Sequence, residues 1–426
     1  MISYKRRFCL SFAQSCQGIH GEIERRLCKM KRRVFSVIGP NLLFYNLARA
    51  GLTIALLLAV LVIAPQRPVH AASIVVDTLG DEDNNDGDCS LREAIYAANH
   101  DVIRDACIAG SGADVIDLTS VDGAITLGGT ELAIISDLTI NGPGADQLAI
   151  SGNDASRVFS VAVGAEVVIS DVTIANGNST GGNGGGISNA GTLTINRCTF
   201  ASNLTNANGG GIGSFGTVTV NSSTFYDNEA SLNGGGIYND EGTLIVNSST
   251  FSENRASEAA FDNYGGGGIC NMAEDGPADL MINNSTIAFN SAMWGGGISN
   301  FDGTLNIKNT IVAENTVHTG GAGPNCHFSS SVTTSYNLES GTDCGFTGTG
   351  DLQSAAAELE PLQNNGGSTW THALQPDSQA INAGSCADTN GNPVTTDQRG
   401  APRISPCDIG AYENPLPVYL PLVRRD

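Results

Sequence analysis

Two carboxylates on neighbouring copies of a repeated phrase are the first candidates for chemistry. Asp227 and Glu253 each stand directly before an asparagine, in the phrases Phe-Tyr-Asp-Asn and Phe-Ser-Glu-Asn. A pair of carboxyl groups on neighbouring strands can hydrolyse a glycosidic bond, one as the acid and the other as the base or nucleophile. Glu314 occupies a related position in a later copy. A solvated acidic edge is therefore the alternative interpretation of these residues.

A second acidic group lies in the loop 81–88, where oxygen ligands for calcium stand near Gly87. The candidate carboxylates are Asp81, Asp83, Asp86 and Asp88. Gly87 comes one place too late for the EF-hand spacing counted from Asp81, and no glutamate follows at the twelfth position. Calcium binding is one hypothesis for this loop, and a solvated acidic turn is the other.

The repeated region lacks the other residues that polysaccharide cleavage would need. A lyase would be expected to place an Arg or Lys base on a strand beside clustered calcium carboxylates. Between residues 165 and 316 the basic residues are Arg197, Arg255 and Lys308, each near a corner. No Cys/His spacing suggests zinc. The residues favour a non-enzymatic protein, with a β-helical polysaccharide hydrolase or lyase as the alternative.

An insertion at residues 256–265 is the strongest sequence candidate for ligand binding, because solenoid insertions usually project on one face. Aromatic and acidic side chains suited to a sugar ring gather there and in the following unit: Glu258, Phe261, Asp262, Tyr264 and Trp294. The alternative is that these aromatic side chains fold onto the core. A third hypothesis is an outward hydroxyl column, as in ice-binding solenoids, formed by Thr199, Thr224, Thr250 and Thr286.

These candidates belong to a repeat in which Gly-Gly-x-Ile, a strand-like run and Phe-x-x-Asn follow one another. The residue before the second phrase recurs at spacings of 34, 26, 25, 26, 36 and 25 residues. Its copies are Thr139, Thr173, Thr199, Thr224, Thr250, Thr286 and Ile311. A period of about 25 residues with alternating apolar residues indicates stacked strands. We predict an all-β, right-handed parallel β-helix of about seven or more coils, with a short N-terminal capping helix.

Stacking would place equivalent residues of successive coils in columns. We expect one inward ladder at Leu193 and its equivalents and another at Phe200 and its equivalents. The corner asparagines would form an amide ladder of Asn203, Asn228, Asn254, Asn290 and Asn315. Several asparagines also read as N-x-Ser/Thr sequons, but their regular recurrence favours a scaffold role over glycan attachment.

The two phrases resemble the GGAI and FxxN motifs of polymorphic outer-membrane protein repeats, with glycine at the third position here. That resemblance implies a surface-exposed β-helix with a role in adhesion.

The amino-terminal residues 1–71 are typical of a leader. Lys31-Arg32-Arg33 precede an apolar run at 52–64 and a small-residue cleavage signal that ends at Ala71. Met30 is an alternative initiator, and an uncleaved membrane tether is the alternative to secretion. Without the leader, 10 Lys and Arg stand against 41 Asp and Glu, a formal charge of −31. A surface of this charge argues against nucleic acid as a partner, and none is expected.

A helix is predicted after the acidic loop. Ser90 and Glu93 form a capping box, and the apolar stripe that follows would close the open end of the solenoid. The hexapeptide Cys89-Ser90-Leu91-Arg92-Glu93-Ala94 resembles the signature of the CSLREA domain, which stands before β-helical bodies in bacterial surface proteins. The resemblance covers about 25 residues and makes 72–130 the cap region.

Eight cysteines remain after the leader. Close spacing favours disulfides within three pairs, although sequence alone leaves other connectivities open. The pairs are Cys89/Cys107, Cys326/Cys344 and Cys386/Cys407. Cys198 and Cys270 fall at different phases of the repeat, so we expect them to be buried thiols. Disulfides would indicate an oxidising compartment.

Beyond the repeats at 131–316, we expect a loop-rich connection at 317–350, a C-terminal region at 351–414 and a tail at 415–426. The C-terminal region contains Trp370-Thr371-His372, Asp397-Gln398-Arg399-Gly400 and Cys407-Asp408-Ile409-Gly410. This series resembles the choice-of-anchor Q domain, which precedes cell-surface anchors. We expect Trp370 and Tyr412 to cap the far end of the core.

The sequence therefore predicts a secreted or cell-surface adhesion, binding or matrix protein. Glycans or cell-surface proteins are its expected partners. Association with the cell envelope is expected without a multi-span membrane domain, and no cofactor is expected apart from the calcium hypothesis.

Overall fold

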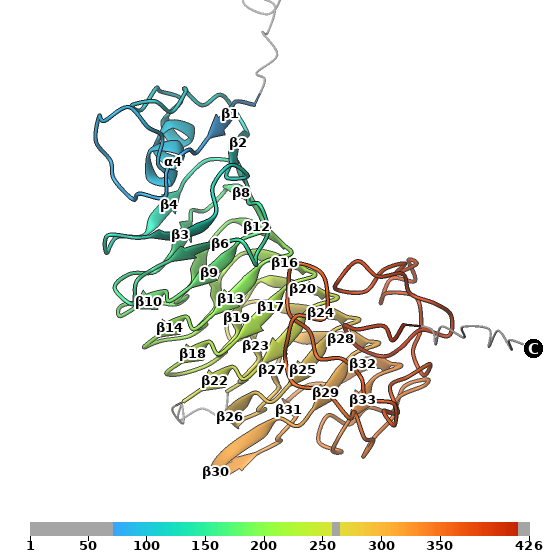
Figure 1. Cartoon of the computed structure of the whole chain (residues 1–426). Coiled ribbons are helices and arrows are strands. Elements are labelled where there is room, and N and C mark those ends of the chain that lie inside the picture. Colours follow the sequence, from blue (N-terminus) through green and yellow to red (C-terminus); the bar gives the residue numbers. More distant parts are fainter. Residues whose placement is uncertain (1–70, 258–264, 416–426) are drawn as a thin grey trace, which may run out of the picture. The chain divides into compact units, whose positions relative to one another are not determined.

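A computed structural model describes residues 71–257 and 265–415 of the chain. The described residues belong to one compact unit and form a parallel β-solenoid of about eight turns, each of about 26 residues (Figure 1). The predicted fold class is confirmed. The leader up to residue 70, most of the insertion at 256–265 and most of the tail at 415–426 lie outside the described residues.

The strands form four parallel sheets. The ten-stranded sheet contains β1 (Ser73–Val75), β2 (Asp114–Asp117), β5 (Leu138–Asn141), β8 (Glu166–Ser170), β12 (Thr192–Asn196), β16 (Thr217–Asn221), β20 (Thr243–Asn247), β24 (Asp279–Asn283), β28 (Thr304–Lys308) and β32 (Val332–Ser335). The nine-stranded sheet contains β3 (Gly123–Thr126), β6 (Leu148–Ser151), β9 (Thr173–Ala175), β13 (Thr199–Ala201), β17 (Thr224–Tyr226), β21 (Thr250–Ser252), β25 (Thr286–Ala288), β29 (Ile311–Ala313) and β33 (Leu338–Glu339).

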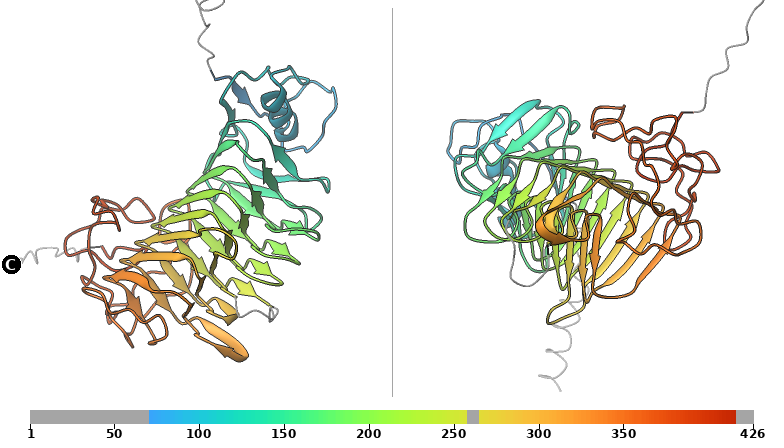
Figure 2. Two further views of the ribbon diagram at one scale, coloured as in Figure 1. Left: turned by 180° about the vertical axis from the view of Figure 1, so that it is seen from behind. Right: turned by 90° about the horizontal axis from the view of Figure 1, so that it is seen from below.

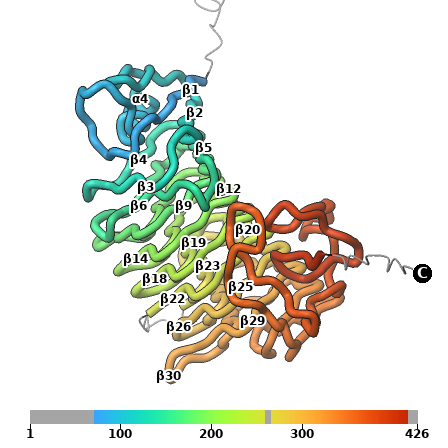
Figure 3. Tube along the Cα trace, viewed as in Figure 1, coloured from blue at the N-terminus to red at the C-terminus, as the bar shows by residue number. Residues whose placement is uncertain are grey.

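The other two sheets complete each coil. The eight-stranded sheet contains β4 (Leu132–Ile134), β7 (Phe159–Val161), β11 (Ile187–Asn189), β15 (Ile212–Ser214), β19 (Ile237–Asp240), β23 (Ile269–Met272), β27 (Ile298–Phe301) and β31 (Cys326–Phe328). The six-stranded sheet contains β10 (Asn178–Ser179), β14 (Leu204–Thr205), β18 (Glu229–Ala230), β22 (Arg255–Ala256), β26 (Ser291–Trp294) and β30 (Thr316–Ala322). Figure 3 shows the stacked coils as a continuous tube.

The glycine triplets close each coil where the backbone must turn sharply beside the next coil. Gly209 has a φ of 74°, a region in which residues with a Cβ are strained. A Cβ on Gly210 would lie 2.4 Å from the carbonyl oxygen of Gly235 in the next coil. Glycine is therefore required here by both conformation and close approach.

The interior is built from columns of identical or similar side chains. Leu193 pairs in register with Val218, and both are fully buried. Phe225 stacks between Phe200 and Phe251, with ring centroids 4.5 and 4.6 Å apart and interplanar angles of 3° and 4°. Because successive coils pair in register, each side chain meets its equivalent one strand spacing away.

Buried asparagines bind the coils together at the corner after the nine-stranded sheet. The amide nitrogen of Asn228 donates to Phe200 O at 2.9 Å and to the amide oxygen of Asn254 at 2.8 Å. The same pattern joins Asn203 to Asn228 and Asn254 to Asn290. Each amide thus satisfies a backbone carbonyl of one coil and the side chain of another.

The N-terminal end of the solenoid is closed by helix α4 (Leu91–His100). Ser90 caps the helix, and its hydroxyl and the Glu93 carboxylate form the expected capping box. Leu91 and Ala94 are fully buried in the main core. The helix therefore covers the apolar layer that the first coil would otherwise expose.

The opposite end differs from the expected loop-rich connection at 317–350. Strands β30 to β33 add another coil there, because β31 pairs with β27 and β33 pairs with β29. The phrase Gly323-Pro324-Asn325-Cys326 replaces the usual triglycine and isoleucine, which hides this coil in the sequence. Phe346 then packs into the main core, and the segment 341–351 closes this end.

The C-terminal region lies along the side of the solenoid rather than at its end (Figures 1 and 2). The expected role of Trp370 and Tyr412 as an end cap is therefore wrong. Trp370 lies beside Tyr226, with ring centroids 6.4 Å apart. Tyr412 packs in a separate cluster with Ile311 and Leu338. The C-terminal region covers the outer face of the nine-stranded sheet.

This packing buries much of the threonine column that an ice-binding surface would need. Thr224 donates to Trp370 O at 2.6 Å. Thr250 donates to the side chain of Gln398 at 2.7 Å, and Ala411 N donates to Thr286 at 3.1 Å. The ice-binding hypothesis is therefore wrong: these hydroxyls hold the C-terminal region in place.

Three disulfides join the close cysteine pairs. They are Cys89–Cys107, Cys326–Cys344 and Cys386–Cys407. They secure the α4 cap, the last coil and the C-terminal region respectively. Cys198 and Cys270 are buried free thiols, as expected from their positions in the repeat.

Replacing one ladder amide should cost much of the solenoid's stability. Asn254→Ala removes donors to Phe225 O and Asn290 and the acceptor of Asn228. Each buried group left without a partner costs about 1–3 kcal/mol, so we expect a loss of about 3 kcal/mol or more in the free energy of unfolding. Guanidinium denaturation measures the free energy of unfolding of the variant and of the wild type. Asn206→Ala, an exposed corner asparagine, is the control and should cost less than about 0.5 kcal/mol. Equal losses would contradict the ladder's role.

Glu339, a buried carboxyl in the last coil, should make the stability of the wild type fall as the pH rises. Glu339 is fully buried, one of its oxygens has no hydrogen-bond partner, and burial raises its pKa from 4.5 to about 7. Ionisation therefore costs stability as the pH rises from 4.5 towards 7. Glu339→Gln should gain about 3.5 kcal/mol relative to the wild type between acidic and weakly alkaline pH, at about 1.4 kcal/mol per pKa unit.

Unfolding midpoints across this pH range provide the measurement. The exposed Glu358→Gln serves as the control and should follow the wild-type profile. A Glu339→Gln profile that stays parallel to the wild type would contradict the expectation.

Candidate functional site

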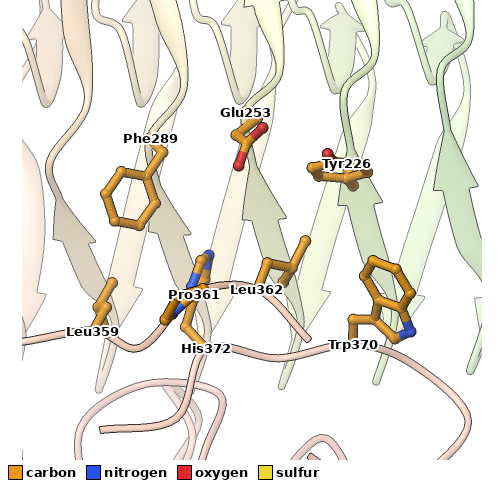
Figure 4. Close-up of a pocket in the computed structure, with 8 residues that line it drawn as sticks. All are labelled: Tyr226, Glu253, Phe289, Leu359, Pro361, Leu362, Trp370 and His372. Atoms are coloured by element: carbon orange, nitrogen blue, oxygen red, sulfur yellow. The ribbon is translucent and has the colours of Figure 1, made fainter. Parts of the chain in front are cut away.

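A recess of about 350 Å³ lies between the nine-stranded sheet and the C-terminal region. Three of its lining residues come from the solenoid, at or next to the corner, and five from the C-terminal region. They are Tyr226, Glu253, Phe289, Leu359, Pro361, Leu362, Trp370 and His372. Figure 4 shows the Glu253 carboxylate between the rings of Phe289 and Tyr226.

The solenoid wall depends on an unusual corner conformation. The residue before each ladder asparagine has a positive φ, which turns its side chain outward. Glu253 has a φ of 57° and Phe289 a φ of 60°. This region is uncommon for residues other than Gly, Asn and Asp, and costs about 1–2 kcal/mol. The ring of Phe289 is held in this conformation with 39% of its surface exposed, and backbone strain of this kind is concentrated at functional sites.

The second wall is a loop of the C-terminal region, and two isolated antiparallel bridges define its shape. Leu359 pairs with Leu374, and Gln363 pairs with Thr371. Trp370 projects from this loop with 45% of its surface exposed. The recess therefore combines a rigid wall of stacked strands with a wall of irregular backbone.

His372 fastens this loop to the solenoid. Its Nδ1 lies 2.7 Å from Glu360 O, and its Nε2 lies 3.0 Å from the Ser252 hydroxyl. Because a carbonyl can only accept, Nδ1 carries the proton and Nε2 accepts from Ser252. Burial lowers the pKa of His372. The histidine is therefore neutral at neutral pH.

The Ser252–His372 pair has the spacing of a nucleophile and its base. Local sequence did not suggest this pair, because 120 residues separate its members. Ser252 is fully buried, so no substrate carbonyl can reach its oxygen. The hydrogen bond therefore positions the loop and does not activate a nucleophile.

The two carboxylates that sequence offered for acid and base catalysis have different surroundings. Glu253 lines the recess, whereas Asp227 does not and accepts a hydrogen bond from the Ser202 hydroxyl at 3.0 Å. Burial, followed by the charges of Glu253 and Asp227, raises the pKa of Tyr226. Both carboxylates thus lie near that phenol, but the recess holds only one of them.

The sequence candidates for ligand binding in the insertion lie outside the described residues: Glu258, Phe261, Asp262 and Tyr264. Trp294 is half-buried at the end of β26, with its ring centroid 5.2 Å from that of His327. It does not line the recess. Sequence reasoning missed the recess because its two walls are far apart in the chain.

The acidic loop before Cys89 does not gather the four carboxylates proposed for calcium. Asp81 pairs with Arg92 at 2.8 Å, and Asp83 pairs with Arg104. The carboxylates that converge, with ligand atoms within 4.8 Å of one another, are Glu82, Asp86 and Asp88. Calcium binding stays a prediction, with Glu82 in place of the two aspartates that bind arginine.

No protein-family model matches the chain, and no curated protein or solved structure matches it. Within the described residues, no helix has both the length and the apolar character needed to cross a membrane. Fold and geometry therefore carry the functional argument.

Acid should loosen the loop that His372 fastens. Burial lowers its folded-state pKa below the ordinary 6.5, so the unfolded chain binds a proton more readily. Stability should therefore fall as the pH drops below 6.5. His372→Gln should flatten this part of the profile, measured by thermal unfolding across pH and by tryptophan fluorescence. His100→Gln, on the exposed end of α4, should keep the wild-type profile. A His372→Gln profile parallel to the wild type would refute this role.

Proposed function

We propose that the chain is a secreted or cell-surface protein that binds glycans without cleaving them. The observation that carries this proposal is the recess, which the rings of Tyr226, Phe289 and Trp370 line together with a single carboxylate, Glu253. Glu253 lies between Phe289 and Tyr226, and Trp370 lies beside Tyr226 (Figure 4). Aromatic rings pack against the apolar faces of sugars, and a carboxylate accepts hydrogen bonds from their hydroxyls. Concave sites lined by aromatic side chains with few polar groups are typical ligand sites.

The scaffold around the recess supports this proposal. The register of β17, β21 and β25 fixes the spacing of the residues on the solenoid wall. Thr224, Thr250 and His372 hold the opposite wall against it through hydrogen bonds. A wall that is already ordered loses little conformational entropy when a ligand binds.

A location outside the cytoplasm is supported by three disulfides, since such bonds persist in oxidising compartments. The closing position of α4 supports assignment of residues 72–130 to a CSLREA-type cap. We further propose that residues 351–414 are a choice-of-anchor Q type region and that the protein is associated with the cell envelope.

Polysaccharide hydrolysis is the alternative function. The proximity of Asp227 and Glu253 to Tyr226 is the observation in its favour. However, hydrolysis uses a pair of carboxyl groups that flank the bond, and Asp227 lies outside the lining of the recess. Binding without turnover is therefore the better-supported function.

Glycan binding can be tested with a glycan array and calorimetry on the purified protein. Trp370→Ala should weaken binding about tenfold, because loss of about 1.4 kcal/mol of ring stacking corresponds to that factor. The matched control is Phe215→Ala, which removes a ring that is 54% exposed outside the recess. Its affinity should equal that of the wild type.

Two outcomes would contradict the proposal. One is equal loss, or no loss, in the two variants. The other is release of shorter saccharides from a polysaccharide panel, with and without calcium, in a reaction that Glu253→Gln or Asp227→Asn abolishes. The second result would establish the hydrolase.

A further inference from the structure

We propose that the recess selects ligands that carry an organic ammonium group, such as an amino sugar or a choline-type headgroup. This inference rests on the proposed binding function and adds the charge of the ligand. The ammonium group would contact the Glu253 carboxylate and the faces of the neighbouring rings.

The recess contains one negative formal charge and no positive one at neutral pH. Glu253 is the acidic residue in its lining, and no Lys or Arg lines it. His372, the titratable group on the C-terminal wall, has both ring nitrogens engaged and is neutral because burial lowers its pKa. Asp227 lies nearby and adds a second negative charge outside the lining. The local charge therefore favours a cation.

Among the described residues, none of the ion pairs involves Glu253. Six arginines pair with carboxylates: Arg92, Arg104, Arg157, Arg197, Arg399 and Arg403. Lys308 donates to Asp388 O, and Arg255 lies on the six-stranded sheet, where its charge acts on His318. None of them supplies a cation to Glu253. A ligand cation would be the first positive charge that this carboxylate meets.

Aromatic rings surround the position that such a cation would take. Tyr226 and Trp370 form a corner, with centroids 6.4 Å apart and planes inclined at 47°. Phe289 stands on the other side of Glu253 (Figure 4). Ring faces attract a cation within about 6 Å of their centroids, most strongly for tryptophan. Glu253 itself is exposed and accessible to a ligand. A carboxylate flanked by ring faces is therefore more complementary to an ammonium group than to a neutral hydroxyl.

A neutral sugar would leave this carboxylate partly desolvated without a partner of opposite charge. Burying an unpaired charge is unfavourable, whereas an ammonium group would neutralise it and donate hydrogen bonds. An anionic sugar would also be repelled by Glu253. We therefore expect the order of affinity to be ammonium, then neutral, then anionic ligands.

Calorimetry with two matched oligosaccharides tests this order. The probes are glucosamine oligomers and N-acetylglucosamine oligomers of the same length, at a pH where the amine is protonated. The wild type should bind the glucosamine oligomer about tenfold more tightly, the factor that a modest charge-assisted contact gives. Salt should weaken this preference. Choline chloride, added as a competitor, shows whether the ammonium group alone is sufficient or the sugar ring is also needed.

Two variants locate the effect. Glu253→Gln keeps the shape of the side chain and should abolish the preference, so that the ratio of its affinities for the two oligomers falls from about tenfold to about one. Glu314→Gln is the control, because Glu314 has the same corner conformation, with a φ of 56°, but does not line the recess. It should keep the wild-type preference. Unfolding midpoints verify that both variants are folded.

The outcomes separate this inference from the proposed function. Equal affinity of the wild type for both oligomers, with loss of binding in Trp370→Ala, would overturn ammonium selection and leave glycan binding intact. A preference that survives in Glu253→Gln would also overturn it. Absence of binding to both oligomers and to the glycan array would overturn both proposals.

Discussion

The corner after the nine-stranded sheet is the constraint on which the rest of the molecule depends. A chain that turns this sharply in every coil leaves backbone carbonyls without a partner in the strands, and burial would make them costly. The ladder of Asn203, Asn228 and Asn254 satisfies them and joins each coil to the next. The same corner forces the preceding residue into a positive φ and so turns its side chain outward. The corner conformation thus joins the coils through the asparagine ladder and also directs a row of side chains outward.

Much of the scaffold could be predicted from the sequence, because the repeat depends on local interactions that recur. The strand positions, the ladder of Asn203 and its equivalents, and the α4 capping box all follow from short phrases. Other amide ladders escaped notice. Asn221 donates to Asn196, and Asn247 donates to Asn221, in a second ladder that the sequence analysis does not predict. Their regular recurrence at one phase was the signal.

The candidate site could not be predicted, because it depends on contacts between distant segments. The hydrogen bond from Thr250 to Gln398 spans 148 residues, and that between Ser252 and His372 spans 120. The C-terminal region has irregular backbone, so no period reveals which face it covers. Sequence could place Glu253 at an acidic edge but not in a recess that Trp370 and His372 also line. Nothing local in the sequence indicates what covers the outward threonines, so the sequence alone predicts a free surface there.

The site therefore arises where a regular surface meets an irregular one. Coil stacking fixes the positions of Tyr226, Glu253 and Phe289 through the pairing of β17, β21 and β25. The outward residues of these corners do not pack in the core, so their identity can change without disturbing the ladder behind them. Phe289 illustrates the cost of such a choice, since a bulky ring adopts a conformation that asparagine or glycine would adopt with less strain. A scaffold that tolerates this strain because both neighbouring coils hold the corner can present an aromatic ring to a ligand. The ladder thus explains why Glu253 and Phe289, which line the recess, stand at the corners and not on the flat faces of the sheets.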